Sequence, residues 1–204
     1  DCWPCVSWSI LDYNGFAKAG YFYTRRAYAP VLASFKKLDD GAVELWITNE
    51  TQSAFDDEMT IELGRFAGGA LWRENARAKM AANTSGAVWR GDAAKIGAAA
   101  DRYLHVTSDN AAVFDNRLFF APIKDLVRPD SARPEVKVVQ QGPHELAVTI
   151  TAPDYLYFTH LIVPHGATRF SDNHFDLVKG QSRTVTVRNP EIVLKPEDVT
   201  VRVF

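Results

Sequence analysis

Short hydrophobic runs with a period of two residues recur from residue 31 to the end of this chain, and they constrain its fold more than any other feature. In the segment 42–49, Val43, Leu45 and Ile47 occupy alternate positions, which places them on one face of a strand. Further strands are expected over 31–37, 59–66, 70–74, 86–90, 103–107 and 117–120. Short strands separated by turns such as Gly68-Gly69 are typical of a β-sandwich.

A proline-rich segment divides this pattern in two. Residues 126–134 contain Pro129 and Pro134 and show no apolar periodicity, as expected of a domain boundary. Beyond it the alternation resumes, and it predicts a second, smaller sandwich with strands over 146–151, 155–163, 184–188 and 199–204. Two alanine-rich stretches, 76–82 and 93–100, favour helix by composition although they adjoin strand patterns.

The first thirty residues have a different character. Asn14-Gly15 indicates a tight turn, and a helix is expected from about residue 17 to 29, where Pro30 ends it. Much of this helix is aromatic, so it requires a surface to pack against. The chain opens without an initiator Met or a signal-peptide pattern, and we expect that surface to lie in sequence upstream of Asp1.

Bulk composition excludes several classes of function. A formal net charge of -2 gives no electrostatic basis for binding nucleic acid, and no apolar run approaches the roughly 20 residues of a membrane helix. Cys2 and Cys5 are the two cysteines of the chain, and two thiols fall short of the four ligands of a structural zinc site. Neither a metal nor a cofactor is expected.

Two motifs lie far apart along the chain. The first comprises Asp1-Cys2-Trp3-Pro4, Ser7-Trp8-Ser9, Asp12-Tyr13, Gly15, Lys18-Ala19 and Tyr28-Ala29-Pro30, and the second comprises Arg169 to Leu177, Gly180 and Thr184 to Val187. The first motif resembles the last strand and helix of the catalytic barrel in β-mannosidases of glycoside hydrolase family 2. The second resembles the C-terminal immunoglobulin-like domain of the same enzymes, and the two occur in the right order.

This resemblance implies a mostly β fold with three parts: residues 1–30 as a remnant of a (β/α)8 barrel, and residues 31–127 and 133–204 as immunoglobulin-like sandwiches. It also implies a retaining exo-β-mannosidase that acts on terminal β-mannosides, in the periplasm or outside the cell. In the family the two catalytic glutamates lie on earlier barrel strands. The chain therefore contains no catalytic residue of its own and is expected to be inactive alone.

The resemblance assigns substrate contacts to the first residues. Trp3 matches a tryptophan that forms a wall of the sugar pocket, where an indole covers the apolar face of a pyranose. Asp1 is a candidate to orient that pocket. The alternatives are that Trp3 is a core residue and that Asp1 has no role in the site, while Trp8 is expected to pack the loop against the barrel.

Other interpretations remain open. Trp46, Trp72 and Trp89 would form a carbohydrate-binding platform if two of them shared an exposed face, which would make the chain a non-catalytic binding module. The alternative is that they pack in the core or between domains. A purely structural scaffold is a third possibility. Relatives that act on β-glucosaminides or β-galactosides share the architecture, so the sugar is less defined than the family.

Several polar groups are expected to be structural. Asp56, Asp57 and Glu58 are interpreted as a solvated run in a turn before a strand. Residues 171–173 have the turn chemistry of Ser, Asp and Asn, which would fix strand pairing, with a sugar or calcium contact through Asp172 or Asp176 as the alternative. The aromatic residues of 155–160 are interpreted as sandwich core. The histidines of the last domain lack the spacing of a metal site.

Overall fold

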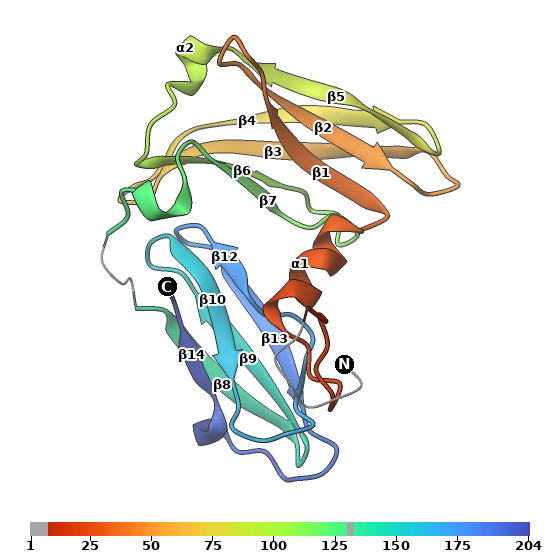
Figure 1. Ribbon diagram of the computed structural model, residues 1–204, viewed down its shortest axis with the longest axis vertical. Coiled ribbons are helices and arrows are strands. Elements are labelled where there is room, and N and C mark those ends of the chain that lie inside the picture. Colours follow the sequence, from red (N-terminus) through yellow and green to blue (C-terminus); the bar gives the residue numbers. More distant parts are fainter. Residues whose placement is uncertain (1–7, 130–132) are drawn as a thin grey trace. The chain divides into compact units, whose positions relative to one another are not determined.

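The computed structural model describes residues 8–129 and 133–204 (Figure 1). These residues form two compact units, one of residues 26–129 and one that joins residues 8–25 to residues 133–204. The two residues predicted to contact sugar, Asp1 and Trp3, lie outside the described residues.

The unit of residues 26–129, called the first sandwich, has two antiparallel sheets. One has the order β1-β2-β5 and the other the order β4-β3-β6-β7. The strands are β1 (Val31–Lys37), β2 (Val43–Asn49), β3 (Phe55–Arg65), β4 (Gly69–Met80), β5 (Thr84–Gly91), β6 (Arg102–Thr107) and β7 (Asn116–Phe119). The alternation of apolar residues that predicted these strands matches their burial, since Val43, Leu45 and Ile47 are all buried.

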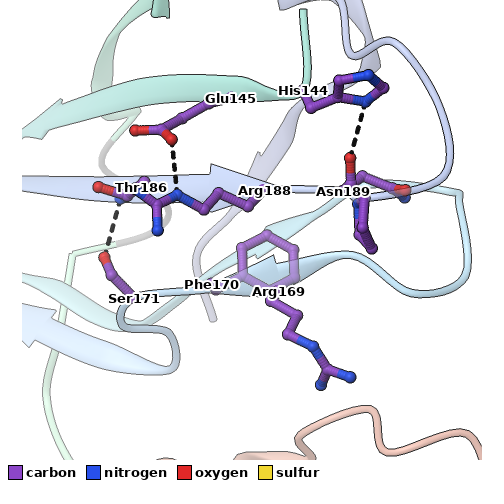
Figure 2. A pocket seen from close by; sticks show the side chains of 9 residues that line it. His144, Glu145, Arg169, Phe170, Ser171, Thr186, Arg188 and Asn189 are labelled. Carbon is purple, nitrogen blue, oxygen red and sulfur yellow. Dashed lines mark hydrogen bonds and ion pairs between the residues drawn. The ribbon is translucent and has the colours of Figure 1, made fainter. Parts of the chain in front are cut away.

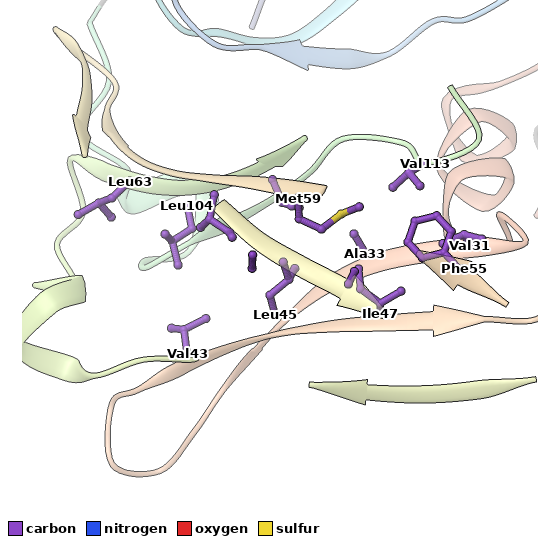
Figure 3. Close-up of a cluster of buried hydrophobic side chains, with 14 of the residues drawn as sticks. Val31, Ala33, Val43, Leu45, Ile47, Phe55, Met59, Leu63, Leu104 and Val113 are labelled. Atoms are coloured by element: carbon purple, nitrogen blue, oxygen red, sulfur yellow. The ribbon is translucent and has the colours of Figure 1, made fainter. Parts of the chain in front are cut away.

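The core of the first sandwich fills the space between its sheets (Figure 3). Leu45 and Ile47 of β2 contribute from one sheet, and Met59 of β3 and Leu104 of β6 contribute from the other. All four are fully buried. Burial of aliphatic side chains from both inner faces is the main stabilisation of a sandwich.

Two expectations for the first sandwich were wrong. The alanine-rich stretch 76–82 is not helical: β4 continues to Met80, because Ala76 and Ala78 point into the core and pair with β3. The acidic run at residues 56–58 lies inside β3 rather than in a turn. In both places cross-strand pairing and burial overrode local composition.

Short helices complete the first sandwich. Helix α2 (Ala93–Ile96) lies in the second alanine-rich stretch, and the Asp92 side chain caps it by accepting the Lys95 N–H at 2.8 Å. It ends after one turn because Gly97 takes the left-handed conformation at φ 51°. A 3-10 helix, η1 (Ile123–Asp125), follows β7.

Residues 133–204 form the second sandwich, also of two antiparallel sheets. Their orders are β11-β13-β9-β8 and β12-β10-β14. The elements are β8 (Glu135–Gly142), β9 (Glu145–Thr151), β10 (Leu156–Ile162), β11 (Arg169–Phe170), β12 (Phe175–Leu177), β13 (Ser182–Arg188), the 3-10 helix η2 (Pro196–Asp198) and β14 (Thr200–Arg202). The predicted β-sandwich is confirmed, although β8, β11 and β12 were not among the expected strands.

The opening segment contains the predicted turn and helix. Leu11 and Ala17 form a bridge around the turn, and Gly15 takes a φ of 74°, which glycine adopts without strain. Helix α1 (Ala19–Ala27) is shorter than expected at both ends. Within the described residues, no helix is long and apolar enough to cross a membrane.

Candidate functional site

The segment 169–177 binds the opening helix through Asp172. The Asp172 carboxylate accepts a hydrogen bond from Arg25 Nη2 of α1 at 3.0 Å and another from Arg183 Nη1 of β13 at 3.0 Å. Arg25 Nη1 also donates to the Ser171 carbonyl at 2.8 Å. The Asp172 side chain is only 14% exposed, so both ion pairs are partly shielded from solvent. We call this group of contacts the Asp172 clamp.

Aromatic packing surrounds the clamp. Phe22 of α1 is buried, with its ring centroid 5.8 Å from that of His174, and Tyr23 stacks on Phe158 at 6.0 Å. Arg169 Nη1 donates to the Gly15 carbonyl at 3.0 Å. The surface we expected upstream of Asp1 is thus supplied, for this face of the helix, by the second sandwich.

The remaining polar residues of the segment bond within the second sandwich. Asn173 Oδ1 accepts the Leu161 N–H at 2.8 Å, and Asn173 Nδ2 donates to the Leu161 carbonyl at 3.0 Å. Asp176 accepts the Tyr155 hydroxyl at 2.7 Å and the Phe158 N–H at 2.8 Å. These contacts favour the structural interpretation of this segment over a sugar or calcium contact.

Two imidazoles lie beside the clamp. His160 stacks on His174 with ring centroids 5.2 Å apart, and the Phe204 ring stacks on His160 at 5.2 Å. Burial, together with the positive charge of Arg202, lowers the pKa of His160. Phe158 and His174 have positive φ angles of 48° and 53°, which is uncommon for residues other than glycine. The packed rings of Phe158, His160, His174 and Phe204 therefore include two residues with strained backbone conformations.

The tryptophans of the first sandwich do not share one open face. Trp72 of β4 and Trp89 of β5 lie with ring centroids 6.2 Å apart and pack against the core. The Lys95 ammonium lies over both rings, at 5.1 Å and 5.7 Å from their centroids. Glu74 accepts hydrogen bonds from Trp89 Nε1 and Lys95 Nζ. The pair is thus partly covered rather than presented as a flat platform.

Trp46 lies on β2, the middle strand of the sheet β1-β2-β5. Its Nε1 donates to Glu44 on the same strand at 2.8 Å, and the Lys36 ammonium lies 5.2 Å from its ring centroid. Trp46 pairs with Ala87 of β5 and Ser34 of β1. Trp72 and Trp89 thus fit the packing interpretation, whereas Trp46 alternates with the buried Leu45 and Ile47 and lies on the outer face of β2.

A buried polar pair lies in the sheet of β3 and β6. The Tyr103 hydroxyl donates to Glu62 Oε1 at 3.0 Å, and Arg73 Nε donates to Glu62 Oε2 at 2.6 Å. Burial, followed by the negative charge of Glu62 and this hydrogen bond, raises the pKa of Tyr103 well above its usual range. A tyrosine held in its neutral form as a hydrogen-bond donor has a structural role here.

The acidic run in β3 is held by neighbouring side chains. Asp56 pairs with Arg77 at 2.5 Å, Asp57 accepts from Ser108 at 2.9 Å, and Glu58 accepts from Asn75 at 2.9 Å. These acids lie on the surface of the first sandwich or at intermediate depth. Their arrangement agrees with the expected solvated role.

One pocket, of about 640 Å³, lies on the second sandwich (Figure 2). It was not predicted, because its residues come from strands separated in sequence. Its walls come from β9, β11, β13 and the turns beside them: His144, Glu145, Arg169, Phe170, Ser171, Thr186, Arg188, Asn189 and Pro190. Across residues 8–129 and 133–204, no group of three His, Cys, Asp or Glu side chains is placed to hold a metal ion.

The residues predicted for the sugar site are not brought together by the described structure. Asp1 and Trp3 lie outside it, so their roles stay predictions. Trp8 is fully exposed in this chain, and its expected packing against the barrel also stays a prediction.

Comparison with known families identifies both sandwiches. Residues 41–125 match the family described as a Mannosidase Ig/CBM-like domain, and residues 131–202 match the mannosidase family described as an Ig-fold domain. No curated protein sequence matches the chain significantly.

Solved structures share the fold at low sequence identity. The β-D-mannosidase from Dictyoglomus thermophilum aligns with a TM-score of 0.83 and 19% identity, over 100% of this chain and 25% of that one. The exo-chitosanase CsxA from Amycolatopsis orientalis aligns with a TM-score of 0.59 and 12% identity, over 99% of this chain and 30% of that one. The chain thus spans less than a third of the length of these relatives.

Proposed function

This chain belongs to the mannosidase immunoglobulin-like domain families, and from this membership we propose that it forms the C-terminal part of a retaining exo-β-mannosidase of glycoside hydrolase family 2. In this proposal the catalytic barrel, with its acid/base and nucleophile glutamates, precedes Asp1. The two sandwiches support that barrel. The single observation that carries the proposal is the match of residues 41–125 and 131–202 to the mannosidase immunoglobulin-like domain families.

The clamp supports this role because of what it joins. Residues 8–25 resemble the end of the family's barrel, and Arg25 ties that segment to the second sandwich through Asp172 and the Ser171 carbonyl. Arg169 adds a bond to the turn at Gly15. Hydrogen bonds between charged groups fix direction as well as distance. The second sandwich would hold the last helix of the barrel, and with it the loop that carries Trp3.

The proposed substrate contacts are Trp3 and Asp1. The Trp3 indole would cover the apolar face of the terminal mannosyl ring, and Asp1 would orient the pocket through a hydroxyl group of the sugar. Chemistry would pass through a glycosyl-enzyme intermediate formed by the upstream nucleophile. No cofactor is required for this reaction.

The test is an activity assay on the longer protein that contains this chain. We expect hydrolysis of p-nitrophenyl β-D-mannoside to exceed that of the β-D-glucosaminide and the β-D-galactoside. Trp3→Ala should lower kcat/KM for the mannoside by about tenfold or more, the equivalent of roughly 1.4 kcal/mol. Trp46→Ala is the control, because Trp46 is a tryptophan on β2 of the first sandwich, outside the segment that carries Trp3. Equal losses in the two variants would remove Trp3 from the substrate site.

The preferred sugar tests the mannosidase assignment separately from the enzyme class. If the β-D-glucosaminide or the β-D-galactoside is the preferred substrate, the enzyme class stands and the mannosidase assignment falls. If the longer protein hydrolyses none of the three, the proposal that it is a glycosidase of this kind is overturned.

A further inference from the structure

The pocket of the second sandwich lies along a row of charged side chains on its outer sheet face. Strand pairing places Arg188 of β13 beside both Arg169 of β11 and Glu145 of β9. The neighbours Leu146 and Val187 point into the core, so the row faces outward. Beside this row the structure leaves a cavity of about 640 Å³, within the range of sites that bind small ligands.

Glu145 and Arg188 provide a hydrogen-bond acceptor next to donors. Arg188 Nε donates to Glu145 Oε2 at 2.6 Å, and this bond uses one nitrogen of the guanidinium and one oxygen of the carboxylate. The Arg188 side chain is 67% exposed and that of Glu145 33% exposed, so their remaining polar atoms face solvent. Donors and an acceptor at this spacing complement two neighbouring hydroxyl groups, each of which donates and accepts.

Of the two guanidinium groups that line the pocket, that of Arg188 is balanced by a carboxylate, and that of Arg169 is bonded to a neutral carbonyl outside the row. The Arg188 guanidinium is paired with Glu145. Arg169 donates to the Gly15 carbonyl at 3.0 Å, and Figure 2 shows its guanidinium directed away from the Glu145–Arg188 pair. A site for an anion would present its cations to the cavity. This arrangement therefore favours a neutral ligand.

Other walls add an apolar surface and hydroxyl partners. Pro190 is exposed and offers an apolar surface, whereas Phe170 pairs with the buried Val187 and closes the pocket from the core side. The Ser171 Oγ accepts the Thr186 N–H at 2.9 Å, which leaves the hydroxyl proton of Ser171 available to donate.

His144 is oriented by the backbone. Its Nδ1 lies 2.6 Å from the Ile192 carbonyl and 3.1 Å from the Asn189 carbonyl. Two carbonyl neighbours require a proton on Nδ1, which makes Nε2 the acceptor of the neutral ring.

We infer that this pocket is a binding site for a neutral sugar, with the Glu145–Arg188 pair bonding two adjacent hydroxyl groups and the exposed Pro190 contacting the ring. This inference goes beyond the proposed function, because it assigns sugar binding to residues of the second sandwich. It does not depend on catalysis. The 204-residue chain can be tested for it directly, so failure of this inference and failure of the enzyme proposal are separate results.

The experiment is a titration of the ¹⁵N-labelled chain with mannobiose, followed by amide chemical shifts. We expect shifts centred on residues 144–145, 169–171 and 186–190, with a Kd of about 1 mM, corresponding to roughly 4 kcal/mol. Arg188→Gln and Glu145→Gln should each weaken binding by about fivefold or more, since each removes one charged hydrogen-bond partner.

Arg77→Gln is the matched control. It removes another exposed Arg–carboxylate pair between neighbouring strands, that of Arg77 with Asp56 on the first sandwich. We expect this variant to bind mannobiose like the unaltered chain. Because Arg188 and Glu145 are partly or largely exposed, their variants should fold, and unchanged spectra of the core residues would verify this.

Three results would overturn the inference. One is an absence of shifts up to about 20 mM mannobiose, a concentration well above the expected Kd. Another is a set of shifts confined to Trp72 and Trp89, which would favour the binding-module interpretation of the first sandwich. The third is tighter binding of inorganic phosphate or glucuronate than of mannobiose, which would make the pocket an anion site.

Discussion

Arg25 Nη2 donates to Asp172 Oδ1 at 3.0 Å, and this bond joins residues 147 positions apart in the sequence. It ties helix α1, near the start of the chain, to a turn of the second sandwich. Arg183 binds the other oxygen of the same carboxylate. A single side chain therefore holds two elements to one turn.

Asp172→Asn should destabilise the unit of residues 8–25 and 133–204. The amide keeps the shape of the side chain but removes the charge that two partly buried guanidinium groups require, and we expect a loss of about 2–4 kcal/mol in the free energy of unfolding. Chemical denaturation measures this change in the free energy of unfolding. Asp154→Asn is the control, since Asp154 pairs with Lys179 at an exposed site and should cost less than about 1 kcal/mol. Similar losses in the two variants would contradict a special role for the clamp.

Gly64→Ala should destabilise the first sandwich. A Cβ at Gly64 would lie 2.3 Å from the Tyr103 ring, which is fully buried and has no room to move. Overpacking of this kind costs about 1–3 kcal/mol. Gly142→Ala is the matched control, because a Cβ there meets nothing within 4 Å. Thermal unfolding should show a lower Tm for Gly64→Ala than for Gly142→Ala. An unchanged Tm for Gly64→Ala would show that the sheet adjusts at this point.

Tyr103→Phe should also lower stability, for a different reason. It removes the hydroxyl that donates to Oε1 of the buried Glu62, while Arg73 still donates to Oε2. An unsatisfied buried acceptor costs about 1–3 kcal/mol. Tyr13→Phe removes a hydroxyl from an exposed ring and should change the free energy of unfolding by less than about 0.5 kcal/mol. Equal small effects would mean that Glu62 finds another donor.

His160 should make stability depend on pH. Burial and Arg202 lower its pKa in the folded chain, whereas the unfolded chain has the ordinary value of about 6.5. Below that pH the unfolded state takes up a proton that folded His160 resists. Stability is therefore highest above about pH 6.5 and falls as the pH drops toward the lower folded pKa.

His160→Gln removes this contribution. We expect its free energy of unfolding to fall less between about pH 7.5 and pH 5.5 than that of the unaltered chain. Denaturation at several pH values measures the two slopes. His165→Gln, at an exposed position, controls for the loss of a histidine as such. If His160→Gln keeps the slope of the unaltered chain, another group causes the pH dependence.

Strand positions were predictable where alternation was strong. The expected strand 31–37 is β1 itself, and 103–107 lies within β6, because each buries alternate side chains or lies at the centre of a sheet. The helix that composition favoured over 76–82 does not form, because two of the alanines fill the core beside β3. Strand β11 has two residues, too few for an alternation of apolar and polar residues to be recognised in the sequence.

The pocket could not have been predicted in the same way. Glu145, Phe170 and Arg188 lie on three different strands, and none of them belongs to a local motif with the other two. They meet because β13 pairs with β9 on one side and with β11 on the other. A signal for such a site exists only once the strand register is known.

The sequence by itself determined the sandwich architecture, the boundary near residue 130 and the likeness to mannosidase domains, because period-two burial, prolines and motifs are local properties of the chain. Tertiary structure decided that Arg25 reaches Asp172, that Lys95 covers Trp72 and Trp89, and that a pocket opens beside Arg188. The reason is physical: contacts between distant residues depend on strand order and register, which local patterns do not encode.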